Sequence, residues 1–224
     1  AAQSLREGDI LMAIDGHPVD KHGQYHDANY GQLTITHLTT TAKAGEAQIF
    51  QVFRDHQVLD VPVTLTVLDA NDYPIAPYVF DQPPHFLIVG GLVIQELSRQ
   101  YLKEWKDWQT NAPARFIYFN QRQWDLFKPG QKVVIISQIF PSPYTLGYEG
   151  INTIRILAIN DQPINQLTDV KTALASPVAG AKGGKFHKFT LSEHPFTLYL
   201  DADQLDAANR EIKRRYDLPL LERL

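Results

Sequence analysis

The stretch that decides the fold reads LREGDILMAIDGHPV and covers residues 5–19. Its apolar run at residues 9–14 predicts a short strand, and Asp15-Gly16 predicts a tight turn, because glycine adopts a positive φ readily. The end of this stretch, AIDGHPV at residues 13–19, is echoed by AINDQPI at residues 158–164. In both places an apolar strand, a polar turn, a proline and a β-branched residue are followed by a predicted loop, a helix and two strands. We interpret this as a duplication of one small module.

The elements of the two copies are expected at corresponding places. The first copy has a loop at residues 20–31 and a helix at 32–43, followed by strands at 48–53 and 59–65 joined by a turn. For the second copy we expect strands at 133–139, 155–160, 186–191 and 195–200, and helices at 98–108, 166–176 and 203–216. The apolar run at residues 86–94 contains Gly90 and Gly91, which indicate a bulge or a close backbone approach. A repeated strand-rich module with one helix predicts an α+β fold and not a doubly wound sheet.

Composition excludes several classes of function. The 224 residues carry a net charge of −4, which argues against a broad surface for nucleic acid or anionic membrane. The chain has no cysteine, so disulfides, thiolate zinc sites, iron–sulfur clusters and cysteine nucleophiles are excluded. It has no run of 18 apolar residues, so membrane insertion is not expected. Since the chain starts without Met or a signal-like segment, we expect it to begin inside a longer protein.

Residues 5–19 resemble the L-x-x-G-D-x-I-x-x-x-x-G-x-x-V signature of the PDZ domains in HtrA/Deg serine proteases. Residues 44–45 and 52–55 are similar to the end of the same domain. The second half resembles the C-terminal PDZ domain of the DegP-like, plant Deg-type branch, at residues 91–94, 101–102, 135–140 and 147–149 and in the final helix. The resemblance therefore implies a C-terminal PDZ tandem of a trypsin-like serine protease, with the protease domain absent.

This resemblance implies two PDZ-like modules, each a small antiparallel β-barrel or sandwich with capping helices. The first, residues 1–70, is incomplete at its N-terminus, because in the family the carboxylate-binding loop and its strand precede the L-x-x-G-D element. A Pro-rich linker is expected at residues 71–84. The second module is expected at residues 85–202, with an aromatic insert at 109–131, and a helix and tail follow at 203–224.

A PDZ domain binds by adding a peptide strand to a sheet edge, while backbone N–H groups of a loop capture the terminal carboxylate. The candidate loop is Gly90-Gly91-Leu92-Val93, and the receiving strand starts at Ile94. The opposite wall would be formed by three residues at helical spacing: Leu167, Val170 and Leu174. The alternatives are a structural bulge for the two glycines and ordinary core packing for the helix face. Val93 stands where the family has a glycine between two apolar residues, so a standard carboxylate pocket is not a firm expectation.

Catalysis by this chain is not expected, because no G-N-S-G-G or G-x-S-x-G string surrounds any of its serines. His17, His22 and His26, with nearby Asp20 and Asp27, could gather a divalent ion. We interpret them instead as solvated loop histidines, so no metal and no cofactor are predicted. We expect His187 and His194 at the surface.

Two functions follow. In the first, the chain is the non-catalytic PDZ region of an HtrA/Deg-like protease, which recognises peptide or protein termini and regulates or assembles the protease. Its partners would be peptides or unfolded-protein segments, its own protease domain and other subunits, in a homo-oligomer. In the second, it is a stand-alone PDZ scaffold or adaptor without peptide capture. The aromatic insert packs as core or contacts another subunit. Family habit places a bacterial parent in the periplasm or cell envelope.

Overall fold

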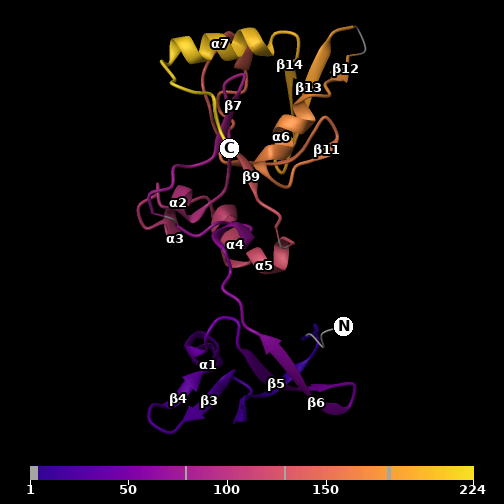
Figure 1. Ribbon diagram of the computed structural model, residues 1–224. Coiled ribbons are helices and arrows are strands. Elements are labelled where there is room, and N and C mark those ends of the chain that lie inside the picture. The colour runs from indigo at the N-terminus through magenta and orange to yellow at the C-terminus, as the bar shows by residue number, and fades with distance from the viewer. Residues whose placement is uncertain (1–4, 79, 129, 181–182) are drawn as a thin grey trace. The chain divides into compact units, whose positions relative to one another are not determined.

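The computed structural model describes residues 5–78, 80–128, 130–180 and 183–224 (Figure 1). The chain divides into two compact units, Ala1–Leu68 and Asp69–Leu224, and each is described by itself. The predicted α+β architecture is confirmed, because both units combine antiparallel strands with short helices. No helix within these ranges is long and apolar enough to cross a membrane.

The first unit is built on an antiparallel sheet with the strand order β2-β1-β5-β6. Its strands are β1 (Ile10–Ile14), β2 (His17–Pro18), β5 (Ala47–Arg54) and β6 (Gln57–Thr64). The alternating apolar residues of β5 and β6 point to one face, where Ile14, Phe50, Val52 and Val61 form the core. The two strands predicted at residues 48–53 and 59–65 are therefore confirmed.

The segment between β2 and β5 differs from the expected loop and long helix. Strands β3 (Gln24–Asp27) and β4 (Gly31–Thr34) form a hairpin, and α1 begins only at Ile35 and ends at Thr41. Two contacts hold the hairpin: the Asp27 carboxylate accepts the N–H groups of Asn29 and Tyr30, and the buried Tyr25 hydroxyl lies 2.5 Å from His37 Nδ1. The expected helix is therefore shorter at its start, because residues 31–34 pair with β3 instead of joining α1.

The second unit contains a larger curled sheet with the strand order β12-β13-β10-β9-β8-β7-β15, while β11 pairs with β10 and β14 with β13. The strands are β7 (Phe86–Val89), β8 (Leu92–Glu96), β9 (Val134–Ile139), β10 (Ile154–Ile159), β11 (Gln162–Pro163), β12 (Val178–Ala179), β13 (Lys185–Leu191), β14 (Thr197–Asp201) and β15 (Glu222–Arg223). The helices are η1 (Ala70–Asp72), α2 (Arg99–Leu102), α3 (Trp108–Asn111), α4 (Ala114–Gln121), α5 (Gln123–Leu126), η2 (Pro143–Thr145), α6 (Leu167–Leu174) and α7 (Leu205–Arg215).

The two copies of the repeat fold alike down to single hydrogen bonds. In both turns the two central residues have positive φ, and β1 pairs with β2 as β10 pairs with β11. The Asp15 carboxylate accepts the N–H of Ile49 at 2.7 Å, and the Asn160 side-chain oxygen accepts the N–H of Lys188 at 2.9 Å. Each turn residue thus joins the strand before it to a strand that follows the helix, β5 in the first unit and β13 in the second.

The aromatic insert forms a second apolar core of the same unit. Phe116 of α4 and Phe127, after α5, are buried with Leu97, Leu102 and Ile135, which supports the packing alternative for these residues. Other aromatic side chains of the insert, Tyr118 and Trp124, are about half exposed. The helix expected at residues 98–108 is wrong: α2 has one turn, and α3 begins only after Asp107, whose φ is +50°.

The Pro-rich segment that we interpret as a linker packs on the second unit through its first half. The Ile75 side chain is fully buried in the second core, and its N–H donates to Gln123 Oε1 at 3.1 Å. The Lys132 ammonium donates to the carbonyl oxygens of Asn71 and Tyr73 at 2.6 and 2.7 Å. Burial lowers the pKa of Lys132.

Candidate functional site

The candidate carboxylate loop is a tight hairpin turn. Gly90 and Gly91 join β7 to β8, and Val89 pairs directly with Leu92 across the turn. Their φ angles are +57° and +100°, as a two-residue hairpin turn of the primed type requires. The Gly90 N–H donates to Asn209 Oδ1 at 2.7 Å, so this amide is engaged by α7. The glycines therefore have a structural role in the turn, which is more specific than the expected bulge.

The expected receiving strand, β8, has partners on both of its edges. On one side Ile94 pairs with Ile136 of β9, and on the other it pairs with Leu87 of β7. Since β7 runs antiparallel to β8, the chain itself has added a strand at the edge where we expected a peptide. This edge of β8 is not open to an added strand while β7 is in place.

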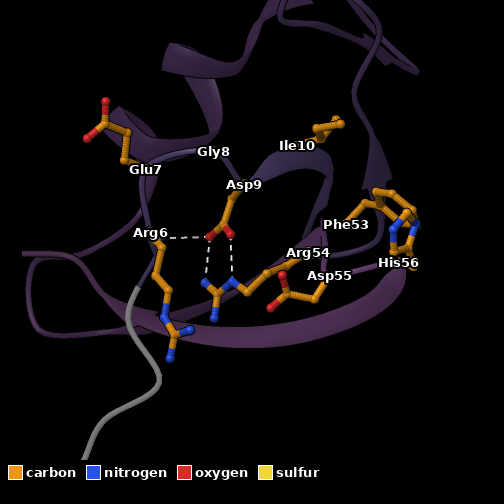
Figure 2. Close-up of a pocket in the computed structure, with 9 residues that line it drawn as sticks. All are labelled: Arg6, Glu7, Gly8, Asp9, Ile10, Phe53, Arg54, Asp55 and His56. Carbon is orange, nitrogen blue, oxygen red and sulfur yellow. Dashed lines mark hydrogen bonds and ion pairs between the residues drawn. The ribbon is translucent and has the colours of Figure 1, made fainter.

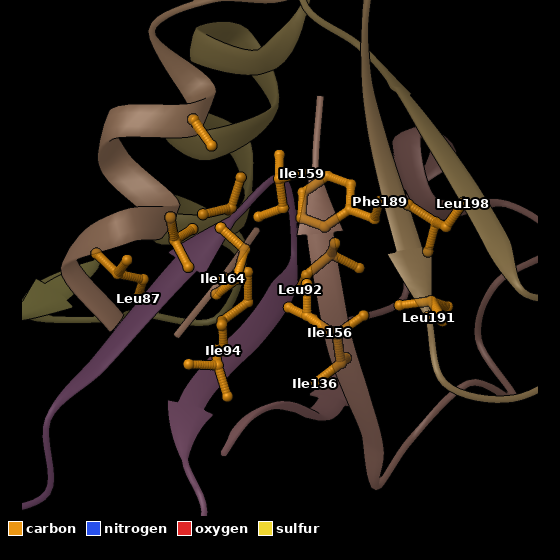
Figure 3. Close-up of a cluster of buried hydrophobic side chains, with 14 of the residues drawn as sticks. Leu87, Leu92, Ile94, Ile136, Ile156, Ile159, Ile164, Phe189, Leu191 and Leu198 are labelled. Atoms are coloured by element: carbon orange, nitrogen blue, oxygen red, sulfur yellow. The ribbon is translucent and has the colours of Figure 1, made fainter. Parts of the chain in front are cut away.

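The helix wall is α6, and the structure brings it to the predicted strand. Leu167 and Val170 are buried in one cluster with Leu92 and Ile94, while Leu174 is half-buried at its border. Figure 3 shows Leu87, Leu92 and Ile94 inside this cluster. The Glu96 carboxylate accepts the Leu167 N–H at 2.9 Å, which fixes the start of α6 on β8. The predicted residues therefore lie together, but those of β8 and α6 pack mainly as core, with β7 among them.

The outer edge of β7 carries a feature that the sequence did not indicate. Strand β15 pairs with it, Glu222 opposite Leu87 and Arg223 opposite Phe86, and the Ile88 N–H donates to the Leu221 carbonyl at 2.7 Å. Two residues show no periodicity, so no sequence pattern could have found this strand.

A cavity of about 440 Å³ opens between α6, α7 and this edge. Its apolar lining includes Leu87 and Val89 of β7, Leu174 of α6, Leu205 of α7 and Leu221, which directly precedes β15. At its border Lys171 Nζ lies 2.8 Å from Glu222 Oε2. The cavity, the strand edge and the lysine together could hold an extended peptide by its backbone, one apolar side chain and one carboxylate.

A second pocket lies in the first unit, at the start of β1 (Figure 2). There the Asp9 carboxylate accepts the Arg6 N–H at 2.8 Å and both Nε and Nη2 of Arg54 at 2.6 Å. The guanidinium hydrogen bonds lower the pKa of Asp9 to about 2. This bidentate pair ties the beginning of β1 to the end of β5, so Asp9 and Arg54 are engaged in holding the sheet.

The loop histidines were considered as candidate metal ligands. Within the described ranges, no three His, Asp or Glu side chains gather as metal ligands. The His17 ring packs edge-on against Tyr25, at 5.3 Å between ring centroids. The surface position expected for His187 is wrong: it is buried, its Nδ1 lies 3.2 Å from Asn160 Nδ2, and burial lowers its pKa.

Comparison with known proteins places the chain. The PDZ domain family matches residues 75–220. Putative protease Do-like 3, mitochondrial, of Arabidopsis thaliana is 24% identical over 73% of this chain and 27% of its own length. Protease Do-like 2, chloroplastic, of the same plant is 24% identical over 75% of this chain and 26% of its own length.

Putative protease Do-like 12, mitochondrial, also of Arabidopsis thaliana, is 22% identical over the whole chain and 36% of its own length. The chain thus spans about a quarter of the first two relatives, and the resemblance to Deg-type proteases is confirmed in its non-catalytic part. Because the family match covers well over half of its residues, the chain belongs to the PDZ domain family.

Proposed function

We propose that this chain is the non-catalytic PDZ region of an HtrA/Deg-like serine protease and that its second unit recognises extended protein segments, including peptide termini. One observation carries the proposal: β7 lies antiparallel on β8 beside α6, so the unit already uses strand addition at the predicted place. The printed names of the relatives, which are Do-like proteases, support the parent activity.

In this proposal the partner binds one strand further out than expected, at the edge of β7 and not at the edge of β8. The predicted site residues then hold β7 in place and do not contact the partner themselves. They are Gly90, Gly91, Leu92, Val93, Ile94, Leu167 and Val170. The partner would lie on the β7 edge, with an apolar side chain directed towards Leu174. Backbone hydrogen bonds would supply affinity, and the cavity would supply selectivity.

Titration with peptides tests the proposal. Fluorescein-labelled heptapeptides ending in Val, Leu or Phe are added to the 224-residue chain and followed by fluorescence anisotropy. We expect binding that Leu174→Asp weakens at least about tenfold, since a charge in the apolar cavity must be desolvated. The control is Leu157→Asp, because Leu157 of β10 is exposed and does not line this cavity. Absence of binding by every peptide, or equal loss in both variants, would refute the proposal.

Regulation and assembly are the second part of the proposal. The region would contact its own protease domain or other subunits in a homo-oligomer, and the half-exposed Tyr118 and Trp124 offer apolar area for such contacts. Pull-down of a Do-like protease domain by this chain tests it; no association at any ratio would contradict it. The compartment follows the parent: the two relatives are named as mitochondrial and chloroplastic, and a periplasmic or envelope location stays a prediction for a bacterial parent.

A scaffold or adaptor without peptide capture is the alternative, and one observation favours it. Both edges of β8 are paired, and the face of α6 is filled by the unit's own side chains. This alternative expects association with other proteins that survives Leu174→Asp, together with no peptide binding in the titration above.

A further inference from the structure

We infer that β15 is a displaceable internal ligand, and that the β7 edge, the adjoining cavity and Lys171 form a docking site for an extended segment with an apolar residue followed by an acidic one. This inference deepens the proposed function and rests on it, because it names what the groove selects and what competes for it.

The attachment of β15 is slight compared with that of the other strands. It pairs through two residues, whereas β7 and β8 pair through four and are buried on one face. Glu222 and Arg223 are exposed, and the ion pair to Lys171 is about half exposed on both sides. Residues 216–221 connect β15 to α7, which ends at Arg215. Segments with few buried contacts open at low free energy, so β15 can leave while the sheet stays intact.

The chemistry of the preferred segment is read from β15 itself. Leu221 lines the cavity, and its carbonyl accepts the Ile88 N–H. The next residue, Glu222, places its carboxylate 2.8 Å from Lys171 Nζ. The cavity of about 440 Å³ is within the range of ligand pockets, so an apolar side chain larger than leucine also fits this site.

Competition between β15 and a partner sets the affinity. A tethered segment acts at an effective concentration in the millimolar range, so a free peptide of the same sequence binds the intact chain at least about tenfold more weakly than the chain without β15. A protein that presents a better segment, or two segments at once, would displace β15.

Nuclear magnetic resonance (NMR) tests the inference with a peptide of the chain's own sequence. An acetylated peptide of residues 218–224, LPLLERL, is titrated into ¹⁵N-labelled chain lacking residues 221–224 and into the full 224-residue chain. We expect the amide signals of Leu87, Ile88 and Lys171 to shift in the shortened chain, with an affinity at least about tenfold higher than in the full chain.

Charge reversal provides the specificity test. In the shortened chain Lys171→Glu is expected to weaken the peptide roughly twofold to fivefold, the range for an exposed ion pair, and a peptide with Glu222→Lys is expected to restore binding. The matched control is Lys188→Glu, since Lys188 makes a similar surface pair with Asp161 at 2.8 Å. In the full chain, Glu222→Lys is expected to speed the hydrogen exchange of the Ile88 amide, a readout that needs no truncation.

The outcomes separate this inference from the proposed function. No binding of LPLLERL to the shortened chain, equal affinity for both chains, or shifts away from β7 and α6 would overturn the internal ligand. If one of these results is obtained with LPLLERL while other peptides ending in Val, Leu or Phe still bind, the proposed function stands without the internal ligand. If LPLLERL binds as expected and no other peptide binds, the internal ligand stands and recognition of other proteins falls.

Discussion

Replacing Gly90 by alanine is the sharpest test of the hairpin that fills the predicted groove. A Cβ at this position would lie 2.3 Å from Cε1 and 2.9 Å from Cδ1 of the Tyr144 ring. The ring cannot swing away freely, because the Tyr144 hydroxyl donates to the Asp201 carbonyl at 2.6 Å. Burial raises the pKa of Tyr144, which keeps this hydroxyl protonated as a donor.

The expected cost has three parts. A non-glycine residue at φ +57° costs about 1–2 kcal/mol, overpacking costs about 1–3 kcal/mol, and the loss of the Tyr144 hydrogen bond costs about 1 kcal/mol. We therefore expect Gly90→Ala to lower the free energy of unfolding by about 3–6 kcal/mol, a large part of the ~5–15 kcal/mol of an ordinary domain.

Urea unfolding followed by tryptophan fluorescence reports the stability of the second unit, because Trp105, Trp108 and Trp124 all belong to it. Two other glycines separate the cost of the backbone conformation from the cost of the close packing. Gly147 has a positive φ but open space around it, so Gly147→Ala should cost about 1–2 kcal/mol. Gly150 has neither constraint, so Gly150→Ala should change stability by less than about 0.5 kcal/mol. Equal losses for Gly90→Ala and Gly147→Ala would refute the close packing under Tyr144.

Three further predictions concern the Asp9–Arg54 ion pair, the buried His187 and the aromatic insert. Asp9→Asn should speed hydrogen exchange of the β1 and β5 amides at neutral pH. Because the folded pKa of Asp9 is depressed, the stability that its carboxylate contributes is present above pH 3.8 and is lost as the pH falls to about 2. The exchange rates of variant and parent should therefore converge at low pH, and a difference that stays constant with pH would contradict this. The folded pKa of His187 is also depressed, so the second unit should lose stability as the pH falls below 6.5, and His187→Gln should flatten that dependence in urea titrations; an unchanged profile would exclude His187 as the cause. Trp124→Ala should cost about 1 kcal/mol through its contact with Tyr73. A reduced mass from light scattering would in addition assign Trp124 to a subunit interface, whereas an unchanged mass would contradict that role.

Local patterns predicted the repeated parts of the fold well. The turns at Asp15 and Asn160 and the strand pairs at residues 48–65 and 186–200 follow from alternation and turn chemistry, which act over a few residues. The helix at residues 98–108 was predicted from periodicity, but its apolar residues pack around the second core from separate turns. Periodicity indicates which residues are buried, not which backbone buries them.

The candidate site was likewise predicted only in part. The groove residues were predicted from resemblance, and α6 does lie against β8. Their accessibility could not be predicted, because it depends on β7 and β15, which come from residues 86–89 and 222–223. The pairing of β15 with β7, over more than a hundred residues, leaves no local signal, whereas the β7–β8 hairpin is local and its two glycines were interpreted as a bulge.

The sequence by itself determined the module and its duplication, the α+β class, the PDZ resemblance and the absence of thiol chemistry and of a serine nucleophile motif, since each follows from residue types at short spacing. Only the tertiary structure decided which strand occupies the edge of β8 and what lies on β7. β7 occupies the edge of β8 because the two-residue turn folds it back onto that strand, whereas β15 lies far from β7 in the chain and finds its backbone partners only when the sheet assembles.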